Sequence, residues 1–99
     1  MYTVDDLLAA AAVAGFPTMC DEVLVDTGRL AVAVTVQVHG EIAVLRLRPI
    51  QPLPSRYGLL LTCPARRCVA VLRAVRRILQ GPRGSLAGLF EERRDAPDG

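Results

Sequence analysis

Apolar residues at every second position, first at Val23 and Val25 and again from Leu30 to Val38, constrain the fold of this chain more than any other feature. A period of two places these side chains on one face of a β-sheet, and valine favours strands. The dipeptides Thr27-Gly28 and His39-Gly40 flank the longest alternating run, and each can supply the positive φ of a tight hairpin turn. Residues 23–48 therefore predict three antiparallel strands in a meander.

Two-residue turns at these dipeptides define a register. The first turn pairs Val25 with Leu30, and the second turn pairs Val36 with Ala43. Both turns place one apolar set on the same face of the sheet: Val23, Val25, Leu30, Val32, Val34, Val36, Leu45 and Leu47. A slip of one residue would move this set to the other face, so the agreement of the two turns supports the meander.

A helix is predicted before the meander. Thr3 and Asp6 match a capping box, in which each side chain bonds the backbone N–H of the other residue. Leucine and alanine continue from there, and Gly15 provides a typical helix stop. We therefore expect a helix over residues 4–14.

The segment after the meander predicts a connector, a strand and a second helix. The proline-rich residues 49–55 are expected to form an extended connector, because proline cannot continue a central strand. Residues 57–63 are apolar and predict a fourth strand. Pro64 is expected in the first turn of a helix that ends at Gly81. Six apolar residues share one arc of this helix: Cys68, Val71, Leu72, Val75, Ile78 and Leu79.

Together these elements predict an α+β fold of two layers. The expected order is helix, three- or four-stranded antiparallel meander, helix (α-β-β-β-(β)-α), with both helices on the valine-rich face. Ser85 is expected to cap a short C-terminal helical turn. We expect a single domain over residues 1–92 and a mobile C-terminal tail over residues 93–99.

The length of 99 residues is too short for an α/β barrel or for two independent domains. His39 is the only histidine, and the sequence contains neither a glycine-rich phosphate loop nor a recognisable catalytic set. We therefore expect a non-enzymatic protein without a cofactor or a small-molecule substrate. Arginine supplies all twelve basic residues, which matches a GC-rich genome and is compatible with a phage or another mobile element.

We expect neither a membrane span nor an export signal in this sequence. The N-terminal residues are acidic rather than basic, and the longest apolar run, residues 7–16, is too short to span a bilayer. The three cysteines are an odd number without a dense pattern. We expect a cytoplasmic protein with reduced thiols that does not enter a membrane.

Two kinds of thiol site stay open as alternatives. Cys63 is expected at a strand end, before a helix and close to two arginines, where a thiolate would be favoured. Alternatively, Cys20, His39, Cys63 and Cys68 could together bind zinc. The spacing of the cysteines matches neither a redox CxxC motif nor a usual zinc knuckle, so buried structural cysteines are the simpler interpretation.

The formal net charge of +2 conceals a strongly polarised chain. Residues 1–45 carry −5, residues 46–90 carry +9 without one acidic residue, and residues 91–99 carry −2. Six arginines are the candidates for a basic surface that binds an acidic protein or nucleic acid: Arg46, Arg48, Arg66, Arg73, Arg76 and Arg77. The alternative is that these arginines only solvate the second helix or pair with the N-terminal acids.

The sheet face opposite the valines also carries apolar residues. Leu24, Ile42 and Val44, with small neighbours, would leave a flat apolar patch on a monomer. We expect a protein partner to cover this patch, and a symmetric homodimer is the simplest arrangement. A candidate anchor for this face or for a partner lies near the C-terminus: Leu86, Leu89 and Phe90.

Two classes of function fit these features. The first is a small protein-interaction domain (an adaptor, an inhibitor or a chaperone-like regulator) that binds an acidic or apolar protein surface. The second is a nucleic-acid-binding protein that uses the arginine-rich second helix. Only four aromatic residues are available to stack on bases, which favours the first class.

Overall fold

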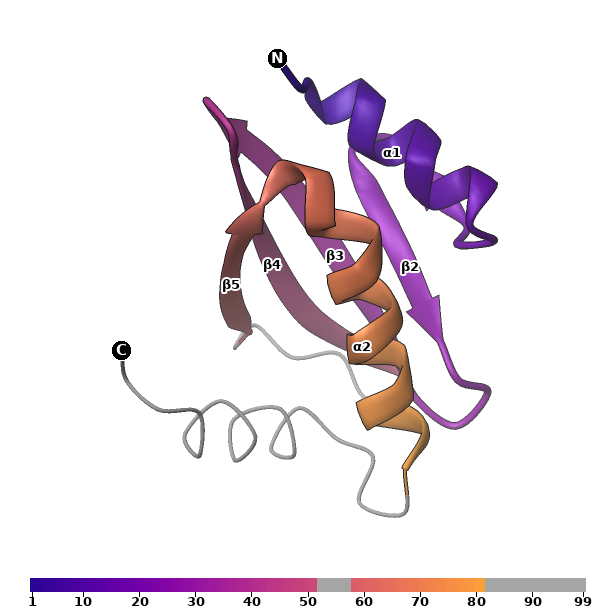
Figure 1. Ribbon diagram of the computed structural model, residues 1–99. Helices are drawn as coiled ribbons and strands as arrows, with labels where there is room; N and C mark the ends of the chain where they lie inside the picture. Colours follow the sequence, from indigo (N-terminus) through magenta and orange to yellow (C-terminus); the bar gives the residue numbers. More distant parts are fainter. Residues whose placement is uncertain (52–57, 82–99) are drawn as a thin grey trace.

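The three strands predicted over residues 23–48 are joined by the predicted fourth strand on one side and by a short strand that was not predicted on the other. The computed structural model describes residues 1–51 and 58–81. Its elements are α1 Val4–Val13, β1 Thr18–Met19, β2 Glu22–Asp26, β3 Ala31–His39, β4 Ile42–Gln51, β5 Leu59–Pro64, the 3₁₀ turn η1 Ala65–Arg67 and α2 Cys68–Gln80. The strands form one antiparallel sheet in the order β1-β2-β3-β4-β5. The predicted α+β fold, with a helix before and after the sheet, is confirmed (Figure 1).

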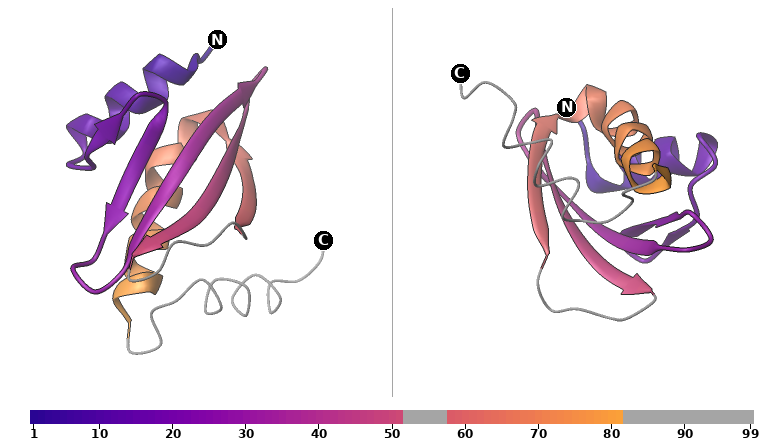
Figure 2. Two further views of the ribbon diagram at one scale, coloured as in Figure 1. Left: turned by 180° about the vertical axis from the view of Figure 1, so that it is seen from behind. Right: turned by 90° about the horizontal axis from the view of Figure 1, so that it is seen from below.

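Both helices pack on one face of the sheet, as predicted, and the sheet curls around α2 (Figure 2). Within the described residues no helix covers the opposite face, which we call the outer face. Nearly all of the predicted alternating set is buried between sheet and helices: Val23, Val25, Val32, Val34, Val36, Leu45 and Leu47. From α2, four residues of the predicted arc are buried in the same core: Cys68, Leu72, Val75 and Leu79.

The predicted register is wrong by two residues at both hairpins. Val25 pairs with Val32 rather than Leu30, because the first hairpin closes through a four-residue loop over residues 27–30. In this loop the Thr27 N–H donates to the Leu30 carbonyl at 2.8 Å, and the Leu30 N–H donates to the Thr27 hydroxyl at 3.1 Å.

The second turn lies one residue later than predicted, at Gly40-Glu41, so that His39 pairs with Ile42. Gly40 has a φ of 65°, which favours glycine at this position. Both errors are even numbers of residues, and an even shift leaves each side chain on its predicted face.

The predicted connector begins too early. β4 continues through Pro49 to Gln51, where Pro49 pairs with Val32 and Gln51 pairs with Ala31. Ile50 is therefore an extra residue in β4, and the strand forms a bulge, which is a position where a sheet accepts proline. Pairing between β4 and β5 ends at Leu47, so Pro49 interrupts no hydrogen bonds to β5.

The helix boundaries agree with the sequence signals at one helix and differ at the other. The capping box of α1 is present: the Asp6 N–H donates to Thr3 Oγ1 at 3.1 Å, and the Thr3 N–H donates to Asp6 Oδ2 at 2.9 Å. Pro64, in contrast, is the last residue of β5 and pairs with Ile42, and η1 separates it from α2. The predicted start of the second helix at Pro64 is thus wrong, because strand pairing extends further than the proline signal indicates.

Several predicted features lie outside the described residues. These are most of the connector, the helical turn after Ser85, the tail over residues 93–99 and the candidate anchor formed by Leu86, Leu89 and Phe90. In the described parts of the chain, neither α1 nor α2 is long and apolar enough to cross a membrane.

Candidate interaction surfaces

The second helix presents a basic surface because its apolar arc is buried. Leu72 and Val75 face the sheet at 0% and 2% exposure, so residues on the other side of α2 point to solvent. Four of the five arginines in η1 and α2 are exposed: Arg66, Arg67, Arg73 and Arg77. The fifth, Arg76, is half-buried.

Arg73, Arg76 and Arg77 come together around a shallow hollow of about 440 Å³. The Arg76 guanidinium lies 4.6 Å from the ring centre of the buried Phe16, which follows α1. This cation–π contact connects α2 to the end of α1 and accounts for the partial burial of Arg76. Arg73 and Arg77 are therefore the two arginines of this group that are exposed to a partner.

A second hollow of about 390 Å³ lies between α2 and β5 and shares Arg77 with the first. Arg67 lines it as well, and small apolar side chains form its floor: Pro64, Ala70, Val71 and Ala74. Arg67 was not among the predicted site residues, because a continuous helix from Pro64 places it to one side of Arg73 and Arg77. Arg67 directly precedes α2, and the neighbouring residues of β5 complete the hollow that it shares with Arg77.

We call Arg67, Arg73, Arg76 and Arg77 the α2 arginine face. The chain has no acidic residue between Ile42 and Phe90, so neither β5, η1 nor α2 itself supplies a counter-charge to this face. Among residues 1–51 and 58–81, an ion pair links Arg48 with Glu22, and no arginine of the α2 arginine face forms one. Arg66 is exposed on η1 but lines neither hollow.

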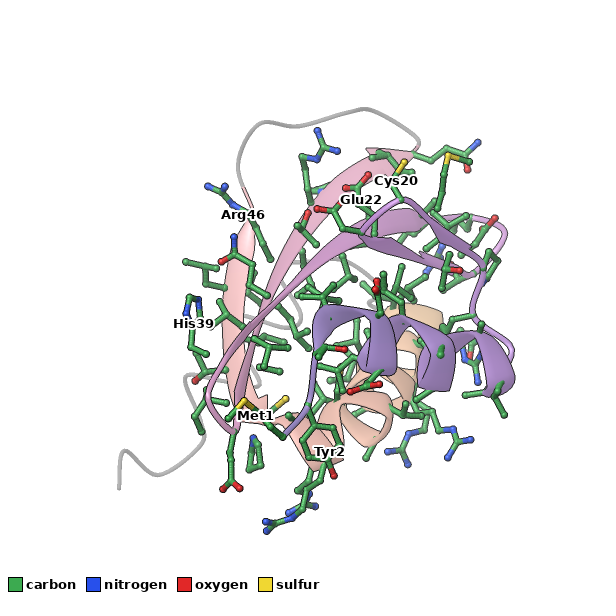
Figure 3. All side chains as sticks on the ribbon, turned by 90° about the horizontal axis from the view of Figure 1, so that it is seen from above. Met1, Tyr2, Cys20, Glu22, His39 and Arg46 are labelled. Atoms are coloured by element: carbon green, nitrogen blue, oxygen red, sulfur yellow. The ribbon has the colours of Figure 1, made fainter. Side chains whose placement is uncertain are left out.

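The other two predicted arginines lie elsewhere. Arg46 and Arg48 belong to β4 and point from the outer face, away from both helices (Figure 3 shows Arg46 and Glu22). Arg48 Nη2 lies 3.5 Å from Glu22 Oε2. The six predicted arginines therefore divide between two opposite surfaces instead of forming one basic site.

The predicted apolar patch of the outer face is also divided. Leu24 lies beside Ala33 on β3, whereas Val44 and Ile42 lie towards the other end of the sheet. A row of polar residues that contains Glu22, Thr35 and Arg46 separates the two groups.

An apolar hollow of about 240 Å³ surrounds Leu24, and sequence analysis missed most of its lining. Met19 and Ile50 contribute exposed apolar side chains, 76% and 36% exposed. The two-residue strand β1 carries no detectable alternation, and the bulge at Ile50 is hidden by the neighbouring prolines. The sequence patterns around Met19 and Ile50 are therefore too short or too irregular to predict that these residues lie on the outer face.

The thiol groups do not converge on a reactive site. Burial raises the pKa of Cys63 above its usual value of 9.0, and the nearby Arg67 only partly offsets this effect. Burial, with a smaller contribution from Cys63, raises the pKa of Cys68 to about 11. Cys20 is exposed. These environments favour the simpler interpretation of Cys63 over the alternative of a stabilised thiolate, because desolvation exceeds the attraction of the arginine.

The four candidate zinc ligands likewise do not assemble. Within the described residues, no group of three or more His, Cys, Asp or Glu side chains could hold a metal ion. Cys68 lies in the core, and His39 is the last residue of β3, next to the turn to β4. The structure therefore favours the interpretation of Cys68 as a core residue.

These environments predict the order in which the thiols react. At pH 8 the raised pKa values keep Cys63 and Cys68 protonated, and only the thiolate reacts with iodoacetamide. We expect rapid alkylation of Cys20, slower alkylation of Cys63 and alkylation of Cys68 only in denaturant, as followed by mass spectrometry. Alkylation of Cys63 ahead of Cys20 would contradict this assignment.

The described residues define a small α+β domain with a basic helix on one side and, on the other, a sheet face that none of their helices covers. Comparisons with protein-family models, with curated proteins and with solved structures find no match to this chain. The functional proposals below are therefore based on these two surfaces.

Proposed function

We propose that the protein is a small non-enzymatic interaction domain whose α2 arginine face binds an acidic surface of another protein. The observation that carries this proposal is the lack of counter-charge: α2 exposes several arginines, and no ion pair neutralises them within the described residues. Exposed charge of one sign steers an oppositely charged partner and selects against others. Such a domain would serve as an adaptor, an inhibitor or a chaperone-like regulator in the cytoplasm.

The hollow between α2 and β5 supports a protein rather than a nucleic acid as the partner. It combines Arg67 and Arg77 with an apolar floor, which suits a segment that carries both acidic and apolar side chains. Phe16 is buried below Arg76 and is not available to stack on a base. The alternative, a nucleic acid on the same arginines, would depend on contacts to phosphates alone.

We also propose that the protein forms a homodimer through its outer face. Within the described residues this face is not covered by a helix, and it exposes Met19, Ile42 and Ile50. A second copy of the chain would remove these apolar side chains from water.

Capture of partners from an extract of the producing cells tests the proposed function. The tagged protein is used with and without prior nuclease treatment of the extract. We expect a defined protein to remain bound after nuclease treatment and to be released by high salt, because salt screens exposed charges. Binding that disappears with nuclease would overturn the proposal in favour of nucleic acid.

A further inference from the structure

Five residues, one from each strand, form a single row across the outer face. The pairs that connect them are Met19 with Glu22, Glu22 with Thr35, Thr35 with Arg46 and Arg46 with Leu60. The centre of the row is Thr35, on the middle strand β3.

The charges of this row are opposite on the two sides of β3. Glu22 lies on β2, where it accepts a hydrogen bond from Thr35 Oγ1 at 3.4 Å and pairs with Arg48 at 3.5 Å. Arg46 lies on β4, is exposed and forms no ion pair within the described residues. The row therefore carries an acid on one side and an uncompensated base at the matching position on the other.

We infer that two copies of the chain pack outer face to outer face, related by a two-fold axis that runs parallel to β3. This operation exchanges β2 with β4 and keeps each position along the strands. Glu22 of each copy then faces Arg46 of the other copy, and Thr35 meets its own counterpart on the axis. An interface between identical surfaces requires this self-complementarity. The inference rests on the homodimer proposed above and specifies its geometry.

The shape and the ends of the row agree with this arrangement. Because the sheet curls around α2, its outer face is convex, and the middle strands meet an approaching copy first (Figure 2). Facing sheets pack about 10 Å apart, a gap that glutamate and arginine side chains can bridge together. At the ends of the row, Met19 and Leu60 are 76% and 53% exposed. The two-fold axis places Met19 of each copy opposite Leu60 of the other copy.

Charge reversal at the two positions tests the inference. In Glu22→Arg, two arginines face each other across the axis on both sides, and in Arg46→Glu two glutamates do. We expect each variant alone to be monomeric in sedimentation velocity, with a dimer dissociation constant raised at least about 100-fold. An equimolar mixture of the two variants should form a heterodimer, because each reversed charge then faces an opposite one.

Controls distinguish an effect on the proposed dimer geometry from a loss of folding and from the absence of a dimer. Circular dichroism checks that both variants are folded, and Arg73→Glu, which makes the same charge change on α2, should stay dimeric. A monomeric wild-type protein would overturn both the homodimer and its geometry. Single variants that stay dimeric, or a mixture that stays monomeric, would overturn the geometry and leave the α2 proposal untouched.

Discussion

Replacement of Leu72 with alanine is expected to lower the free energy of unfolding by about 3 kcal/mol. Leu72 is fully buried in the middle of α2, between the helix and the sheet. The loss combines the transfer free energy of the removed methyl groups with the cost of the cavity that they leave. Small domains have only about 5–15 kcal/mol of net stability, so this single change should lower the urea midpoint strongly.

Val13→Ala is the matched control for this prediction. Val13 also belongs to a helix and is truncated to alanine, but its side chain is 91% exposed at the end of α1. We expect a change in unfolding free energy of less than about 0.5 kcal/mol. Equal effects of Leu72→Ala and Val13→Ala would show that α2 does not pack on the sheet as described.

The double variant Arg73→Glu/Arg77→Glu is expected to weaken binding of the captured protein partner at least about 100-fold at low salt. Both side chains are exposed, so the change should leave the fold intact. Reversal of charge replaces two attractive contacts with an acidic surface by two repulsive ones. The difference should shrink as salt is added, because exposed charges are screened over a Debye length of about 10 Å at 0.1 M.

Arg46→Glu/Arg48→Glu is the matched control on the opposite side of the molecule. It makes the same change in net charge on the outer face. Isothermal titration calorimetry gives the affinity of the partner for one α2 arginine face. This affinity should be the same in a monomer and in a dimer, so loss of the homodimer in the control variant should not change it. We expect wild-type affinity; a loss equal to that of the α2 variant would show that net charge, rather than the α2 arginine face, determines binding.

Alternation and turn chemistry predicted which face of each strand is buried, although they did not predict the register. Val25 and Val36 have other partners than expected, but they are buried as predicted, because the pairing is shifted by two residues at each hairpin and an even shift keeps the face. A tight two-residue turn at Thr27-Gly28 could not be distinguished from the four-residue loop, since the Thr27–Leu30 hydrogen bonds depend on the folded backbone. Strand β1 has two residues and no pattern to detect.

The charge pattern predicted the arginines of α2 but not how the arginines divide in space. Residues 46–90 look like one basic block in sequence, yet Arg48 and Arg73 lie on opposite sides of the sheet, because the chain crosses from β4 through β5 to α2. The grouping of Arg67 with Arg77 around one hollow depends on the position of β5 beside α2, which no local signal indicates. The row across the outer face requires the register of all five strands and therefore appears only in the structure.

Arginine footprinting of the complex with the captured partner tests the central claim most directly. Every basic residue of the chain is an arginine, so an arginine-selective dicarbonyl reagent, read by mass spectrometry, reports on all of the basic surface. The account predicts that the partner protects Arg73 and Arg77 from modification while Arg46 and Arg48 react as they do in the free protein. Protection of Arg46 and Arg48, with unchanged reaction at Arg73 and Arg77, would contradict it.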